Sequence, residues 1–167
     1  MDYQKASRYW IDKEKDSVKM DEVKLLERID AFLKEHNTMA LATGYQDKVR
    51  CTPLEYNYYD GFFYVFSEGG EKFVGLEKNS NVSAAIFDSY TGFGNIHSLQ
   101  VTGHVEIIDE NSDEFEHVAT KKGLNMKAIR KMGVSFNLLK IVPEMYEFLD
   151  SDLKKEGYSN RQRYVFD

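Results

Sequence analysis

The feature that most constrains this chain is a series of six short segments, rich in branched and aromatic residues, that begins after Asn37. Turn signals separate these segments, which cover residues 38–43, 49–56, 62–66, 82–87, 99–108 and 141–149. Their composition is typical of β-strands, and the connections at residues 44–48 and 59–61 are short enough for hairpins. The first three strands are therefore predicted to form an antiparallel meander.

Six short strands with hairpin-like spacing favour a closed or nearly closed antiparallel barrel, because a flat sheet of that size would leave exposed edges. Two of the strands, YVF within residues 62–66 and SAAIF at residues 83–87, read as buried on both faces. One face would meet the barrel interior and the other a helix or a second subunit. We therefore expect a mainly β fold with flanking helices, assembled as a homodimer.

Helices are expected around the strands. From Met20 to His36 the apolar residues follow the 3.6-residue period of an amphipathic helix. Further helices are expected at residues 3–12, 71–79 and 112–132, the last interrupted near Gly123, and a short final strand at residues 163–166. The 167 residues contain no linker or repeat, so we expect a single domain over residues 1–167 with N-terminal helices.

Composition excludes several classes of function. The net charge is -6, with 28 acidic and 22 basic residues mixed along the chain, so no basic face is expected to bind nucleic acid. No apolar run approaches the roughly 20 residues of a membrane helix, and the first residues lack the apolar core of a secretory signal. We therefore expect no membrane partner.

Cysteine and histidine usage narrows the chemistry further. Cys51 is the single cysteine, so no internal disulfide can form, which fits a reducing cytoplasm. The four histidines, His36, His97, His104 and His117, are scattered without i, i+4 spacing to another ligand. Local spacing therefore predicts no metal site, and no hydrolase motif stands out.

The first candidate site lies where the third predicted strand ends. Ser67 is followed by Gly69 and Gly70, and a short helix is expected to begin at Glu71 and Lys72. Glycines allow close backbone approach, a helix N-terminus offers free N–H groups, and Ser67 and Lys72 add a hydroxyl and a cation. This pattern suits an anion, although Glu68 and Glu71 oppose one. The alternative is a plain strand-to-helix turn with a solvated Lys72.

The second candidate segment is VRCTPLEY, at residues 49–56. Alternate residues of a strand share a face, so Arg50 and Thr52 point the same way. If that face meets a ligand, Arg50 can balance an anionic charge and Thr52 can donate or accept a hydrogen bond. Pro53 indicates an irregular strand. The alternative is an arginine that is merely exposed.

From about Ala31 to Asp109 the chain resembles the pyridoxamine 5'-phosphate oxidase-like family of FMN-binding split β-barrels. The resemblance rests on order and spacing: a helix running into TMALATG, then VRCTPLEYNYYDGFFYVFS, then LEKNSNVSAAI, then LQVTGHVEI. It implies an antiparallel split β-barrel of the FMN-binding type with FMN (flavin mononucleotide) at a dimer interface. Carried over by position, the cofactor-binding residues are Arg50, Thr52, Ser67 and Lys72, the last two at the phosphate.

The chain departs from the family pattern in three places. Glu71 occupies a position before the helix lysine where many relatives have a hydroxyl residue. The flavin-contacting glutamine of the oxidases corresponds to Ser98, and Gln100, two residues on, is the cofactor-binding candidate on that face, with a surface amide as the alternative. The tail SNRQRYVFD lacks the substrate-binding histidine of the oxidases, which argues against pyridoxamine phosphate oxidase activity.

The resemblance implies an FMN-dependent oxidoreductase that acts on an unidentified small molecule, with a nicotinamide, NAD(P)H, as a candidate electron donor. The cofactor would carry the redox chemistry, so no catalytic side chain is required. The alternatives are a non-catalytic flavin-binding or sensing protein, a haem-binding protein and an interaction domain.

Overall fold

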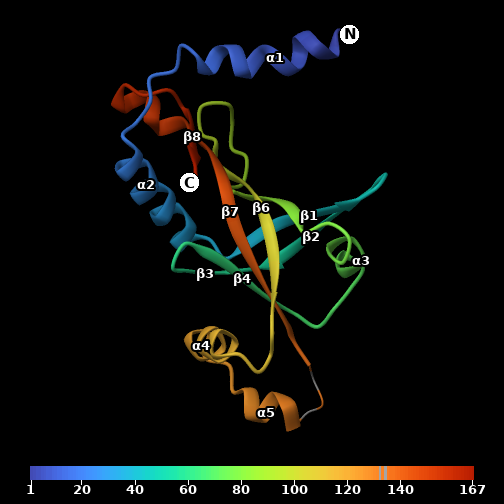
Figure 1. Cartoon of the computed structure of the whole chain (residues 1–167). Coiled ribbons are helices and arrows are strands. Elements are labelled where there is room, and N and C mark those ends of the chain that lie inside the picture. Colours follow the sequence, from blue (N-terminus) through green and yellow to red (C-terminus); the bar gives the residue numbers. More distant parts are fainter. Residues whose placement is uncertain (132, 134) are drawn as a thin grey trace.

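The computed structural model describes residues 1–131, 133 and 135–167 and contains one long, curled antiparallel sheet with helices around it (Figure 1). The strands are β1 (Thr38–Tyr45), β2 (Lys48–Glu55), β3 (Asn57–Tyr59), β4 (Phe62–Ser67), β5 (Asn81–Phe87), β6 (His97–Ile108), β7 (Asn137–Asp150) and β8 (Arg161–Val165). The helices are α1 (Tyr3–Glu14), α2 (Glu22–Glu35), α3 (Lys72–Leu76), α4 (Asp113–Lys121), α5 (Met126–Lys131) and the 3₁₀ helix η1 (Ser151–Glu156). The mainly β prediction is confirmed.

The strand order is β2-β1-β5-β6-β7-β4-β3, with β8 paired to β7. The predicted hairpins β1–β2 and β3–β4 are present, but the prediction of a three-strand meander is wrong. The chain leaves the β1 edge after Glu55, where Tyr56 enters the core and its N–H donates to the Asn37 carbonyl at 2.8 Å. The β3–β4 hairpin therefore joins β7 at the other end of the order, and the curl of the sheet brings β4 near β2.

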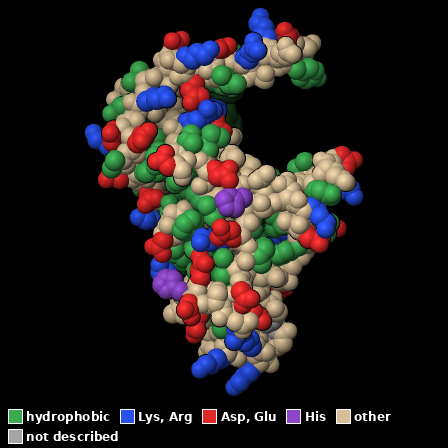
Figure 2. All heavy atoms as spheres, in the orientation of Figure 1, with side chains coloured by type: hydrophobic (Ala, Val, Ile, Leu, Met, Phe, Trp, Pro, Cys, Tyr) green, Lys and Arg blue, Asp and Glu red, His purple; other side chains and the backbone are tan. Residues whose placement is uncertain are grey.

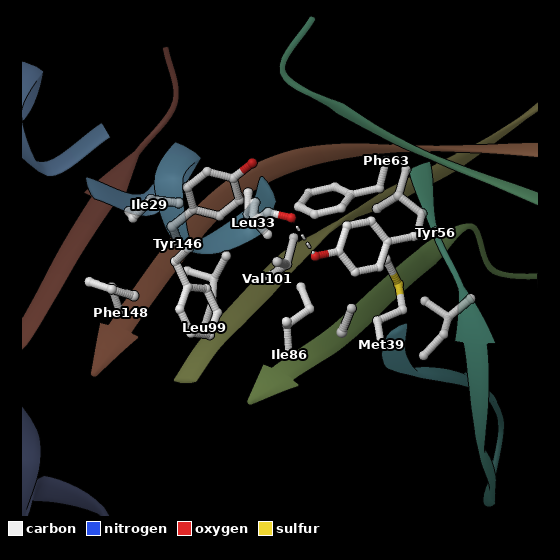
Figure 3. Packing of buried hydrophobic residues seen from close by; sticks show 14 of the residues in the cluster. Ile29, Leu33, Met39, Tyr56, Phe63, Ile86, Leu99, Val101, Tyr146 and Phe148 are labelled. Carbon is white, nitrogen blue, oxygen red and sulfur yellow. Dashed lines mark hydrogen bonds between the residues drawn. The ribbon is translucent and has the colours of Figure 1, made fainter. Parts of the chain in front are cut away.

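Helix α2 covers the concave face of the sheet and forms the main core with it (Figure 3). The helix begins at the N-cap Asp21, whose carboxylate accepts hydrogen bonds from the next turn, and its buried residues are Leu25, Ile29, Phe32 and Leu33. The hydroxyl of Tyr56 donates to the Leu33 carbonyl at 3.0 Å. This bond satisfies one of the last carbonyls of α2, which have no partner within the helix.

The two strands predicted to be buried on both faces differ. In β4, Phe63 and Val65 face the main core, while Tyr64 is covered by α4, so both faces are buried as predicted. In β5, burial alternates, and Ser83 and Phe87 are exposed in the single chain. The outer face of β5 therefore lacks a covering helix among the described residues.

The expected interruption near Gly123 separates α4 from α5, and Gly123 has a φ of +77°. The last residue of the predicted helical stretch, Met132, lies outside the described residues. Helix α1 projects from the body, and acidic and basic side chains are interspersed over the face shown in Figure 2. None of the helices in the described part of the chain is long and apolar enough to cross a membrane.

Candidate functional site

The turn between β4 and α3 has the conformation of a backbone cradle. The Ser67 Oγ donates to the Gly69 carbonyl at 3.1 Å and accepts from the Gly69 N–H at 3.3 Å. Gly69 and Gly70 have φ values of +153° and +112°, in the region that favours glycine. These glycines let the chain reverse within three residues and carry Lys72 back over the turn.

The N–H groups that this turn leaves free belong to residues before α3 and to its first residue, because the next amides of this short helix are already hydrogen-bonded. The amides of Phe73 and Val74 donate to the carbonyls of Gly70 and Glu71, both at 3.1 Å. Within the described part of the chain, the amides of Gly70, Glu71 and Lys72 donate to no protein acceptor. The donors that remain for an anion are therefore consecutive backbone amides in the turn itself.

Lys72 is the cation of this site, and it is only 5% exposed. Its Nζ donates to the Gly69 carbonyl, and it pairs with no carboxylate among the residues that the structure describes. Burial, followed by the nearby Arg50 guanidinium, lowers the pKa of Lys72 below its usual value. A buried ammonium without a counter-charge is unfavourable, so this environment suits an anionic ligand.

Arg50 lies next to this turn because β2 pairs with β1, on which α3 packs. Its guanidinium forms an ion pair with the carboxylate of Glu71, and both side chains are more than half exposed. The sequence predicted that Glu71 would repel an anion. The ion pair with Arg50 offsets this repulsion, because it balances the negative charge of Glu71. An exposed pair of this kind is worth at most about 1 kcal/mol, so a phosphate can compete for Arg50.

Thr52 shares the inner face of β2 with Arg50, as the sequence predicted, and lies opposite Leu41 of β1. Its Oγ1 atom is buried and has no hydrogen-bond partner among the described residues. An unpaired buried hydroxyl costs roughly 1–3 kcal/mol, so a ligand that pairs with it gains affinity. Together with the cradle and the unpaired Lys72, this hydroxyl shows that the donor set of the site fits a phosphorylated, hydrogen-bonding ligand such as FMN.

Gln100 lies on the opposite face of the sheet. Gln100 pairs with Ala85 of β5, which pairs with Ala40 of β1, so these three residues share the outer face. Thr52 pairs with Leu41, the neighbour of Ala40, and therefore faces inward. The single chain therefore brings Arg50, Thr52, Ser67 and Lys72 to one region and leaves Gln100 apart from them. Gln100 instead lines an outer pocket of about 310 Å³ with residues that include Phe87, Tyr90 and His97.

One polar residue of this region was missed from the sequence. Thr43 of β1 is 3% exposed and lies directly opposite Arg50 in the β1–β2 ladder. A Cβ atom added to Gly75 of α3 would lie 3.7 Å from the Thr43 Oγ1, so the helix packs closely on it. Strand alternation in TMALATG places Thr43 on the same face as Met39 and Leu41, and this polar exception in an apolar row was the available signal.

Comparison with known proteins identifies the class of protein that this fold and site define. A family model described as pyridoxamine 5'-phosphate oxidase matches residues 25–150. This match covers most of the chain, including the curled sheet from β1 to β7. The protein belongs to the pyridoxamine 5'-phosphate oxidase-like split-barrel family, as the sequence resemblance implied.

Solved structures with the same fold differ in the ligand that their descriptions name. An FAD-binding protein from Mesorhizobium loti is 21% identical, with a TM-score of 0.56 over 72% of this chain and 89% of that chain. The haem storage protein HutZ from Vibrio cholerae is 19% identical, with a TM-score of 0.58 over 71% and 89%. A NimC/NimA family protein from Clostridium acetobutylicum is 19% identical, with a TM-score of 0.58 over 84% and 91%. No curated protein matched the chain.

Proposed function

We propose that this protein binds FMN and acts as an FMN-dependent oxidoreductase on a small molecule. The observation that carries the proposal is the buried, unpaired Lys72 beside the Ser67–Gly70 cradle. A cation in that position gains most from a doubly charged phosphate, which also accepts hydrogen bonds from the consecutive amides.

Each candidate residue has a distinct part in holding the cofactor. Lys72, the Ser67 hydroxyl and the turn amides would bind the phosphate, and Arg50 would add a second cation once it leaves Glu71. Thr52 would pair its buried Oγ1 with a polar edge of the flavin. Bound FMN would supply the redox chemistry, taking electrons from a donor such as NAD(P)H and passing them to the substrate, while the protein contributes position and exclusion of solvent.

A homodimer is part of this proposal because no helix in the described part of the chain covers the outer face of β5. On the outer face of the sheet, Phe87 of β5 is 60% exposed and lines the pocket that contains Gln100, and Val49, farther away on β2, is 80% exposed. Phe87 and Tyr90, both exposed, line this pocket together, and an exposed apolar patch of this kind is typical of a protein interface. A second copy packed there would place its own Gln100 at the interface and could bring that residue to the flavin of its partner.

The competing function is haem binding or flavin binding without turnover. The fold alone does not discriminate, since one solved structure with this fold is described as FAD-binding and another as a haem storage protein. The donor set favours the flavin nucleotide, because the described site offers cations, amides and hydroxyls for a phosphate. None of Arg50, Thr52, Ser67 and Lys72 carries the imidazole, thiolate, thioether or phenolate group that usually holds haem iron.

Fluorescence titration with FMN and with riboflavin tests the binding claim. FMN should bind at least tenfold more tightly, because riboflavin lacks the phosphate; equal affinities would contradict the assigned phosphate site. Steady oxidation of NAD(P)H by the FMN-loaded protein in the presence of quinone or nitroaromatic acceptors would support an enzyme. Tight FMN binding without turnover across such a screen would instead favour the sensing function.

A further inference from the structure

A second polar cluster lies at the end of the sheet where β6 begins and β7 ends. His97 opens β6 and pairs in register with Asp150, the last residue of β7, while Asp152 follows in η1. One ligand atom from each of these three side chains lies within 4.8 Å of the other two. Strand pairing, not local sequence spacing, brings the three groups together, which is why the spacing of the histidines predicted no metal site.

The ring of His97 is held with one nitrogen facing the two carboxylates. Its Nδ1 lies 3.1 Å from the Asp88 Oδ2, and a carboxylate only accepts hydrogen bonds, so Nδ1 carries the proton of this contact. The other nitrogen, Nε2, lies 3.5 Å from the Asp150 Oδ1 and 3.6 Å from the Asp152 Oδ2. A carboxylate that orients a histidine in this way is a common second shell of metal sites.

The distances suit an ion better than a direct hydrogen bond. An N–H···O bond spans roughly 2.7–3.2 Å, so both Nε2 contacts are too long for one. Around a tetrahedral zinc ion with bonds of about 2.0–2.2 Å, neighbouring ligand atoms lie about 3.3–3.6 Å apart. The two Nε2 distances, 3.5 and 3.6 Å, fall within this interval. Both Nε2 distances are therefore compatible with a shared ion, and the two carboxylate oxygens lie within 4.8 Å of each other.

Each carboxylate has one oxygen bound by a cationic side chain and turns the other toward His97. Arg28 donates to the Asp150 Oδ2 at 2.9 Å, and Lys155 donates to the Asp152 Oδ1 at 2.6 Å. These bonds fix the carboxylates while leaving the Asp150 Oδ1 and the Asp152 Oδ2 toward Nε2. Asp150 is only 4% exposed and its Oδ1 also accepts the Asp152 N–H at 2.8 Å, so its position is well determined.

The local charge also favours a cation. The cluster and its contacts contain the carboxylates of Asp88, Asp150, Asp152 and Glu156, against the cations Arg28 and Lys155. His36 contacts the second oxygen of Asp88 at 2.8 Å. The four carboxylates outnumber Arg28 and Lys155, and a divalent ion would balance the excess.

We propose that His97, Asp150 and Asp152 bind one divalent transition-metal ion, with zinc as the best match to one imidazole and two carboxylates. Three protein ligands leave at least one position of the ion open to water or to a small ligand. The ion would join the ends of β6 and β7 to η1, on an element set apart from the Lys72 turn. The proposed ligands include none of Arg50, Thr52, Ser67 and Lys72, although His97 also lines the outer pocket that contains Gln100.

Calorimetric titration of the chelator-treated full-length protein with zinc chloride tests this proposal. One zinc ion per chain should bind, His97→Gln and Asp152→Asn should each weaken binding more than tenfold, and Asp88→Asn should weaken it by about 10- to 100-fold. His104→Gln is the matched control, because His104 lies on the same strand and contacts Glu144 at 2.8 Å. Its affinity for zinc should equal that of the wild type.

Two results would overturn the proposal. The first is a wild type that binds no zinc at micromolar concentrations. The second is zinc binding that His97→Gln and Asp152→Asn leave unchanged. That result would assign the ion to the exposed thiol of Cys51, or to His104 with the neighbouring carboxylates of Glu106 and Glu144. Circular dichroism checks folding, and Asp152→Asn decides the question if His97→Gln does not fold, since Asp152 is partly exposed.

Discussion

Replacing Lys72 by methionine removes the buried cation while keeping most of the side-chain volume. Lys72 is 5% exposed and its ammonium donates to the Gly69 carbonyl, so a phosphate in the turn would meet it away from bulk water. A charge-assisted hydrogen bond of this kind is worth about 1.5–3 kcal/mol. Lys72→Met should therefore weaken FMN binding by about 10- to 150-fold in a fluorescence titration.

The same substitution should not destabilise the protein without its ligand. Burial lowers the pKa of Lys72 in the folded chain, so between that lowered value and the usual 10.5 the unfolded chain binds more protons. The free energy of unfolding of the wild type should then rise with pH through that interval. The unfolded chain binds the extra proton there, and it loses this advantage as the proton concentration falls. Urea unfolding of ligand-free Lys72→Met should show equal or greater stability at pH 7 and a weaker rise at alkaline pH.

Two comparisons make the result specific to phosphate. Riboflavin affinity should change little in Lys72→Met, because riboflavin lacks the group that Lys72 would contact. Glu71→Gln should have the opposite effect and increase the affinity for FMN by up to about fivefold, because the substitution frees Arg50 from an exposed ion pair. Unchanged FMN affinity in Lys72→Met, or an equal loss of FMN and riboflavin, would refute the placement of phosphate at this turn.

Three further substitutions test the site and its scaffold. Ser67→Ala should weaken FMN binding by about 0.5–1.5 kcal/mol in the same titration, and a larger loss than in Lys72→Met would reverse the proposed ranking. Tyr56→Phe should lower the free energy of unfolding by about 1–3 kcal/mol in urea, because the Leu33 carbonyl loses its buried donor; no change would show that water replaces the bond. Gly103→Ala should yield little folded protein on expression, because its Cβ would collide with the backbone oxygen of Val142; a normal yield would contradict this packing.

Much of the fold could be predicted because the chain changes its hydrophobic period where the structure changes type. The period of 3.6 over residues 20–36 and the alternation after Asn37 located α2 and most strands within a few residues. The strand order could not be predicted in this way, because the pairing of β4 with β7 joins residues 70 to 78 positions apart in the sequence. Hairpin spacing describes only neighbours in sequence, which is why the meander prediction failed after Tyr56.

The candidate site was only partly visible in the sequence. Turn glycines and strand alternation pointed to Ser67, Lys72, Arg50 and Thr52, which depend on local geometry. Lys72 is buried without a carboxylate partner among the described residues, and this property depends on the packed structure alone. His97 and the two aspartates come from segments far apart in the sequence, so no local pattern could have predicted that they form a cluster.

The absorption spectrum of the purified protein, recorded before and after loading with FMN and removal of the excess, tests the central claim most directly. We predict flavin bands near one FMN per chain that persist through gel filtration. A protein that retains no FMN under these conditions, or that shows a Soret band in place of the flavin bands, would contradict the assignment of FMN to the Lys72 site.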